Sequence, residues 1–447
     1  MFYKKLLLLT VVTGVLLQNT GSAFEKKIRE EFRQTKEQYQ ESEKSLSASL
    51  LYEQPSLDRY LTQALLYHPG LKAAFYMWQA AMERIPQAKA VLDPMLDYSY
   101  RIQAAKAGTV GMAEQRIGIG QEFQLFGKRG LKGKMVWTRA TLARLDFMEQ
   151  RLKVIFEVKE AYYDYYWLKR MLSLMENNLK LLEQLEEVVR VRYAANASQY
   201  TDILRLQVEN GKIKNEISSL EAQRIPLDQR LKSLLNIQDT VLLPFPVSIP
   251  TDTLRWETDS LWVQLQVRNP MLRRTQEELR LARIQLSLTK REFLPNLMLS
   301  VDYTFSADGE MMDVLDQRDY PWMGMVSLGL PLNWRKMLGM VKEMGGELQA
   351  KFFEQQGMQN ELKNRLATMI FEYNDNRRKI KLYEQNLIPK VEVELKSMET
   401  AFRAGHADFL DLIEAQRMRL MFQQNLEEAV VECAKNLAEI KMLMGVE

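Results

Sequence analysis

Residues 134–210 decide the fold, and they read KMVWTRATLARLDFMEQRLKVIFEVKEAYYDYYWLKRMLSLMENNLKLLEQLEEVVRVRYAANASQYTDILRLQVEN, without a single Gly or Pro. Apolar residues recur at spacings of three and four, as in Leu142, Leu145, Met148 and Leu152. This spacing is typical of the buried seam of a coiled coil. At a rise of about 1.5 Å per residue, the roughly 60 residues up to Tyr193 predict a helix on the order of 90 Å long. The small and polar residues 194–198 end it.

The composition limits the classes of protein. The 447 residues suffice for two or three domains, and the low content of Gly (20) and Pro (13) favours a helix-dominated protein. The net charge is +3, and Lys4 and Lys5 supply two of these charges in a segment that we expect to be removed. The mature chain therefore indicates neither nucleic-acid binding nor a polybasic membrane patch. One Cys and two His leave no disulfide framework and no Cys-based metal cluster.

The N-terminus reads as a secretory signal at residues 1–23. Lys4 and Lys5 precede an apolar run over residues 6–17, and small residues at 21–23 offer a cleavage site. The apolar run is too short to span a bilayer, which requires about 20 residues. Residues 24–55, rich in Glu, Lys, Gln and Ser, predict a helical lead-in with frayed ends.

The remainder of the chain resembles itself. Pro69 and Pro94 recur as Pro270 and Pro295 at an offset of 201 residues, and Asp202 and Gln207 recur as Asp411 and Gln416 at an offset of 209. The repeated order of motifs predicts a tandem duplication, with copies at residues 56–238 and 258–447. A Pro-rich linker at residues 239–257 separates the copies.

Four segments alternate between apolar and polar residues, which predicts strands at 95–104, 115–126, 296–306 and 322–332. Long helices are expected at 131–193, 336–403 and 408–444, so the fold class is mainly α with a small β part. Strands of this length and pattern fit a transmembrane β-barrel, with an ordinary half-buried hairpin as the alternative. In a barrel the lipid-facing residues are Leu96, Tyr98, Tyr100, Ile102, Ile117, Ile119, Leu299, Val301, Tyr303, Phe305, Val326 and Leu328.

Four strands cannot close a barrel, and open strand edges in lipid leave backbone groups unpaired at several kcal/mol each. The pattern therefore predicts an oligomer, in which two chains give eight strands and three give twelve. Both sizes are allowed.

Several motifs together resemble the TolC family of outer-membrane efflux ducts. They are the His-Pro and Asn-Pro starts at 68–69 and 269–270, the strand exits at 121–123 and 330–332, and the helix turns at 192–204 and 402–412. In the first turn Asn196 stands where the family has Gly. Because Asn tolerates a left-handed backbone, we expect this turn to form.

The resemblance implies a homotrimer in the outer membrane, with a 12-strand β-barrel continued by a 12-helix α-barrel in the periplasm. It implies a passive duct that works with a periplasmic adaptor protein and an inner-membrane transporter. The periplasmic aperture falls at Asp411 and Glu414, and at Asp202 in the first copy, where Arg205 replaces the second acid. A solvated helix face or a helix-start carboxylate is the alternative for these acids. The short turns, with Ala195, Asn196, Ser198, Ala404 and Gly405, are the expected adaptor-docking tips.

Residues 121–130, QEFQLFGKRG, resemble the branch of the family that serves heavy-metal cation pumps, although Gln124 stands where that branch usually has Pro. The 25 methionines are scattered and mostly indicate core packing. Dedicated heavy-metal efflux and a periplasmic coiled-coil scaffold are the two alternatives to a general efflux duct. The sequence has no nucleotide loop, zinc motif or nucleophile elbow, so no enzyme, cofactor or resident metal is expected.

Overall fold

A computed structural model describes residues 28–37, 56–102, 113–238, 242–250, 258–306 and 322–446, with the single positions 26 and 39. The predicted signal peptide and most of the predicted lead-in lie outside these residues, although residues 28–37 are helical. The chain forms two compact units. Unit 1 comprises residues 1–75, 148–269 and 362–447, and unit 2 comprises residues 76–147 and 270–361. Each unit therefore draws on both copies of the duplication.

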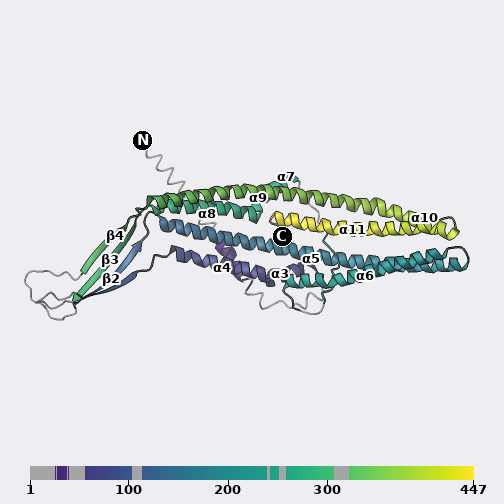
Figure 1. Cartoon of the computed structure of the whole chain (residues 1–447), viewed down its shortest axis with the longest axis horizontal. Coiled ribbons are helices and arrows are strands. Elements are labelled where there is room, and N and C mark those ends of the chain that lie inside the picture. Colours follow the sequence, from purple (N-terminus) through teal and green to yellow (C-terminus); the bar gives the residue numbers. More distant parts are fainter. Residues whose placement is uncertain are drawn as a thin grey trace, which may run out of the picture. The chain divides into compact units, whose positions relative to one another are not determined.

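The elements alternate as the duplication predicts (Figure 1). The first copy holds α3 (Leu57–Tyr67), α4 (Pro69–Lys89), β1 (Met95–Ile102), β2 (Ala113–Phe123), α5 (Lys128–Ala194) and α6 (Tyr200–Leu235). The second holds α7 (Thr258–Arg268), α8 (Pro270–Glu292), β3 (Asn296–Ser306), β4 (Trp322–Gly329), α9 (Trp334–Leu382), the π-turn η1 (Tyr383–Leu387), α10 (Ile388–Ala404) and α11 (Phe409–Leu443). The predicted fold class, mainly α with four strands, is confirmed.

The two long helices differ in continuity. Helix α5 runs unbroken for 67 residues. The matching helix of the second copy, expected at 336–403, is interrupted by η1, where the N–H of Ile388 donates to the carbonyl of Tyr383. Pro389 follows directly, and a proline has no N–H and collides with the carbonyl four residues earlier. The wider π-turn is the local solution that keeps the helix going.

The strands form one antiparallel sheet in unit 2, in the order β1-β2-β3-β4. The central pair β2–β3 joins the two copies, and β1 and β4 are the edges. Strand β2 ends at Phe123, three residues before the predicted end, because Phe126 and Gly127 have positive φ angles of 58° and 72°. Strand β4 ends at Gly329, since Pro331 cannot donate to a ladder.

The core of unit 1 is built along the apolar seam of α5. Buried seam residues such as Val158, Tyr165 and Leu168 pack with residues of α6 and α11 in one hydrophobic cluster. Tyr60 of α3 meets Tyr162 edge-on, with ring centroids 5.4 Å apart. The seam that the sequence predicts is therefore the core of the helical hairpins.

Part of the Pro-rich linker packs against α5 and α6 through a buried ion pair. Asp228 and Lys232 lie 2.7 Å apart with side chains 0% and 2% exposed. The N–H of Leu243 donates to the other oxygen of Asp228 at 2.7 Å, and the Leu243 carbonyl accepts from the Tyr165 hydroxyl at 2.8 Å. These contacts fix residues 242–250 to the hairpin.

The variant Asp228→Ala is expected to destabilise the protein by about 3–5 kcal/mol, because it leaves the buried charge of Lys232 without its partner. The loss of helical circular dichroism on heating measures the effect. The control is Glu221→Ala, which removes an exposed carboxylate from the same helix. Equal melting of the two variants would contradict a structural role for the pair.

Candidate functional site

The two helix turns of unit 1 share one backbone geometry. Asn196 follows α5 with φ 57°, and Gly405 follows α10 with φ 82°, so both caps are left-handed. In each turn the next N–H bonds back to a carbonyl five residues earlier, from Ala197 to Arg192 and from His406 to Ala401, both at 2.8 Å. This is the Schellman pattern of helix ends. Asn196 thus forms the turn that the sequence predicted in spite of its missing Gly.

The turns present little side-chain bulk. Ala195, Asn196, Ala404 and Gly405 are exposed, and Ser198 is half-buried. A Cβ atom added to Gly405 would meet no other atom within 4 Å. The tips are therefore open backbone surfaces that another molecule can approach closely.

Arg192 ties the two turns to each other. Its guanidinium donates to the carbonyl of Phe402 and, at 3.0 Å, to that of Ala197. It also stacks over the Phe402 ring at 4.4 Å, and Phe402 packs against Phe409 with ring centroids 5.9 Å apart. One residue of the first copy thus holds the second copy's turn, and the two tips form a single patch.

The three acids predicted for the aperture lie in two different environments. Asp411 and Glu414 are exposed on α11, on the side opposite the buried Leu412 and Ile413, and neither forms an ion pair with another described residue. Asp202 is only 8% exposed, and its carboxylate accepts from the N–H of Gln199 at 3.1 Å in a capping box. Asp202 therefore stabilises the start of α6, and only Asp411 and Glu414 present unengaged carboxylates.

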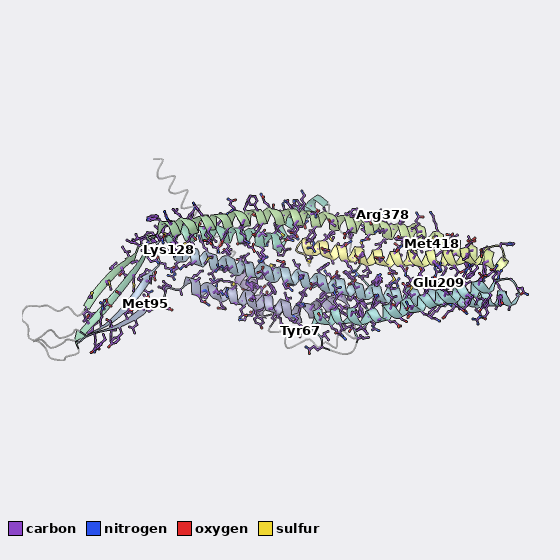
Figure 2. All side chains as sticks on the ribbon, viewed as in Figure 1. Tyr67, Met95, Lys128, Glu209, Arg378 and Met418 are labelled. Atoms are coloured by element: carbon purple, nitrogen blue, oxygen red, sulfur yellow. The ribbon has the colours of Figure 1, made fainter. Side chains whose placement is uncertain are left out.

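Polar contacts between the hairpins were not predicted from the sequence. The amide of Gln416 donates to that of Asn178 at 2.7 Å, and both residues are buried. Arg417 of α11 donates to both oxygens of Glu209 on α6, at 3.0 and 2.7 Å, and these bonds lower the pKa of Glu209 (Figure 2). Asn178 interrupts the apolar seam of α5, and that interruption was the available signal. A buried polar residue in a seam fixes the register of its helices.

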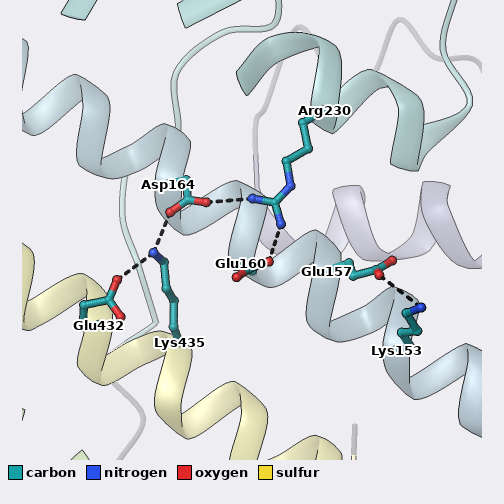
Figure 3. Close-up of polar contacts among 7 residues, drawn as sticks. All are labelled: Lys153, Glu157, Glu160, Asp164, Arg230, Glu432 and Lys435. Atoms are coloured by element: carbon teal, nitrogen blue, oxygen red, sulfur yellow. Dashed lines mark hydrogen bonds and ion pairs between the residues drawn. The ribbon is translucent and has the colours of Figure 1, made fainter. Parts of the chain in front are cut away.

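A second charged network joins α5, α6 and α11 (Figure 3). Asp164 accepts from Arg230 at 3.0 Å and from Lys435 at 2.6 Å, while Arg230 also binds Glu160 and Lys435 also binds Glu432. Burial alone would lower the pKa of Lys435, but its hydrogen bonds to the two acids raise it overall. Because every charge here has a partner, the network holds helices together. Among the described residues no group of three or more His, Cys, Asp or Glu residues is arranged to hold a metal ion.

The sheet has an apolar and a polar face, as expected. The predicted lipid-facing residues are exposed, from 38% for Tyr303 to 76% for Leu96, except that the side chains of Ile102 and Phe305 lie outside the described part. On the other face Ser300 and Asp302 are buried, and Asp302 pairs with Arg116 of β2. None of the described helices is long and apolar enough to cross a membrane.

The fold and the site define a class of protein, namely a chain of duplicated helical hairpins with a four-stranded sheet that has an exposed apolar face. Known structures share this fold. The outer membrane protein VceC of Vibrio cholerae matches with a TM-score of 0.73 and 16% identity, over 88% of this chain and 97% of that one. The open state of the MtrE outer membrane channel of Neisseria gonorrhoeae also matches with 0.73 and 16%, over 88% and 89%.

Sequence comparison agrees with the fold. Residues 261–446 match the model of the outer membrane efflux protein family. Nodulation protein T of Rhizobium leguminosarum bv. trifolii is 21% identical over 426 residues, which cover 88% of this chain and 86% of that protein. The chain belongs to the outer membrane efflux protein family, so the resemblance seen in the sequence is confirmed. The predicted localisation in the outer membrane, with a periplasmic helical part, is confirmed with it.

Proposed function

We propose that the protein is the outer-membrane duct of a tripartite efflux system, which passively carries substrates delivered by an inner-membrane transporter through a periplasmic adaptor. One observation supports this most directly. A chain of helical hairpins carries a single sheet whose apolar face is exposed and whose edges β1 and β4 are unpaired within the chain. Lipid tolerates such a sheet only when its edges are closed.

The assembly that closes the sheet is a homotrimer. Three copies bring β1 of one chain beside β4 of the next and give twelve strands, an even number that barrels in this membrane allow. The apolar face then meets lipid and the polar face, with Asp302 and Arg116, lines water. In this assembly the tips are the docking surface for the adaptor, and Asp411 and Glu414 line the periplasmic aperture.

The duct performs no chemistry of its own. His68, one of only two histidines, serves as a cap at the start of α4, where its Nδ1 accepts from the N–H of Leu71 at 3.2 Å. Burial lowers the pKa of His68, which favours the neutral ring that this bond needs. The four-stranded sheet also favours a duct over a coiled-coil scaffold, because a scaffold has no use for an exposed apolar strand face.

Cells that lack the gene, complemented with the wild-type chain, test the function. We expect complementation to restore export of a fluorescent efflux substrate and the purified protein to run as a trimer that dissociates on heating. A folded monomer that is stable in buffer without detergent would contradict the proposal.

Two neighbouring residues of β4 test the membrane orientation of the sheet. Val326→Arg places a charge on the exposed apolar face and is expected to cost about 2–4 kcal/mol at mid-membrane depth, which should sharply reduce trimer in the outer-membrane fraction. Ser327→Arg is the matched control, since Ser327 lies on the opposite face of the same strand. If the control is the more damaging of the two, the faces are assigned the wrong way round.

The second candidate, heavy-metal cations as the exported substrate, has one observation in its favour. The strand register places Met95, Met298, Met323 and Met325 on the polar face of the sheet, together with Ser300 and Asp302. Thioethers favour soft cations such as Cu(I). Replacing all four by Leu should lower copper or silver tolerance but leave dye export unchanged. Replacing four helical methionines is the control, and equal tolerance of both variants would count against this substrate class.

A further inference from the structure

Four segments that are far apart in the sequence meet where the sheet joins the helices of unit 2. They are residues 89–94, 122–134, 290–296 and 330–342. The register pairs Met95 with Gly120, Phe123 with Leu297 and Asn296 with Gly329. The start of β1, the end of β2, the start of β3 and the end of β4 therefore share one edge of the sheet.

Direct contacts hold these segments together. The guanidinium of Arg129 donates to the carbonyl of Lys89 at 2.8 Å, and Arg291 donates to that of Phe126 at 2.8 Å. The ammonium of Lys128 (Figure 2), itself buried, donates at 2.7 Å to both the Leu294 carbonyl and the Asn296 side chain. The junction is thus a built part of the fold.

The junction concentrates positive charge. The four segments contain only three acids, Asp93, Glu122 and Glu292, against ten bases, which we call the basic junction: Lys89, Lys128, Arg129, Lys132, Lys134, Lys290, Arg291, Arg335, Lys336 and Lys342. Ten positive and three negative charges give +7, whereas the whole chain carries +3. The rest of the chain is therefore net negative.

These charges are not neutralised by the protein. None of the ten bases forms an ion pair with a carboxylate in the described part of the chain, although pairs are common elsewhere, such as Arg365 with Glu439 at 2.6 Å. Lys128 is buried and Lys132 half-buried, and the other eight are exposed. An exposed, unpaired charge of this size calls for an anionic partner.

The neighbourhood of the basic junction identifies that partner. Leu330, Leu332 and Trp334 lie in the same segments and are 64%, 77% and 64% exposed. Apolar and aromatic anchors followed by basic residues mark the boundary between hydrocarbon and water in membrane proteins. The junction lies on the helical side of the strands, and the helices are periplasmic, so it faces the inner surface of the outer membrane.

We propose that the basic junction binds the head groups of anionic phospholipids in the periplasmic leaflet of the outer membrane. Each Lys or Arg near an anionic lipid surface strengthens binding several-fold, and the effect decays within a Debye length. A trimer presents three such junctions around one barrel. The lipid therefore fixes the depth of the barrel and strengthens the trimer.

The test uses the purified full-length trimer and a quadruple variant, Lys132→Gln, Lys134→Gln, Arg335→Gln and Lys336→Gln. Vesicles of phosphatidylcholine with and without 20% phosphatidylglycerol are the probe in a binding assay by density flotation. We expect the parent to bind the anionic vesicles more than tenfold better than the neutral ones, and the variant to lose most of this preference. The matched control, Lys180→Gln, Lys390→Gln, Lys396→Gln and Arg403→Gln, removes four exposed bases from unit 1 and should keep it.

Two further measurements keep the result decisive. Raising NaCl from 50 to 500 mM should remove the preference of the parent, and Lys-for-Arg exchange at 335 with Arg-for-Lys exchange at 132, 134 and 336 should retain it. An unchanged lipid preference in the quadruple variant would overturn the proposal. So would a variant that binds lipid normally but fails to bind the acidic surface of a periplasmic adaptor, because the junction would then serve a protein.

Discussion

A Gly405→Trp variant is expected to lose efflux to the level of the gene deletion, while its trimer and its place in the membrane stay intact. A side chain at Gly405 projects into open space, so the indole would stand on the tip where the adaptor is proposed to dock. The left-handed backbone at φ 82° adds a local cost of about 1–2 kcal/mol, too small to unfold a chain of this size. Substrate accumulation in complemented cells and trimer recovery from membranes are the two measurements.

The duplication itself supplies the control for this variant. Asn occupies the equivalent left-handed position 196 of the first turn, so Gly405→Asn repeats a solution that the chain already uses. We expect it to retain efflux. If the Trp variant exports as well as the Asn variant, the tips are not the docking surface.

The second large effect is expected from the double variant Asp411→Asn with Glu414→Gln. In a trimer the exposed carboxylates of three α11 helices approach one another at the aperture and form rings of like charge. Such rings concentrate cations and bind multivalent ones, because one ion can satisfy several carboxylates. The parent channel should be cation-selective and blocked by multivalent cations added on the periplasmic side. The double variant should lose selectivity and weaken the block by at least about tenfold, a drop on the order of the coupling that such charges provide.

Single-channel recording in planar bilayers measures both properties. The control is Glu384→Gln with Glu428→Gln, which removes the same number of exposed carboxylates from other parts of the same unit. Asp202→Asn should change the block little, because its carboxylate is engaged at the helix start. A double variant that is blocked as tightly as the parent would show that Asp411 and Glu414 lie outside the pore.

Local patterns made much of the fold predictable. The seam of α5, the alternating strands and the turn at Asn196 each follow from residues close together in the sequence, where periodicity and backbone preference act directly. The Asn178–Gln416 pair and the ion pair of Glu209 with Arg417 could not be found this way, since they depend on which faces of distant helices meet. The π-turn before Pro389 is a similar case, because a proline inside a helix can kink, end or widen it.

Net charge misled for a physical reason. Averaged over the mature chain, the charge is close to neutral, which led to the prediction of no polybasic membrane patch. The structure shows instead that antiparallel pairing of β1 to β4 gathers bases from four separate segments at one edge. A total charge carries no information about such gathering, which only the strand order provides.

The way the two compact units share the chain has a consequence for biogenesis. Unit 1 needs residues 362–447, and its α11 helix contacts α5 through Gln416 and Asn178. An exported chain emerges N-terminus first, so the long apolar seam of α5 enters the periplasm well before its partner from the second copy. Contacts so distant in sequence form slowly, and exposed apolar surface aggregates in the meantime. The chain is thus expected to depend on periplasmic holding chaperones until its last helix has crossed the inner membrane.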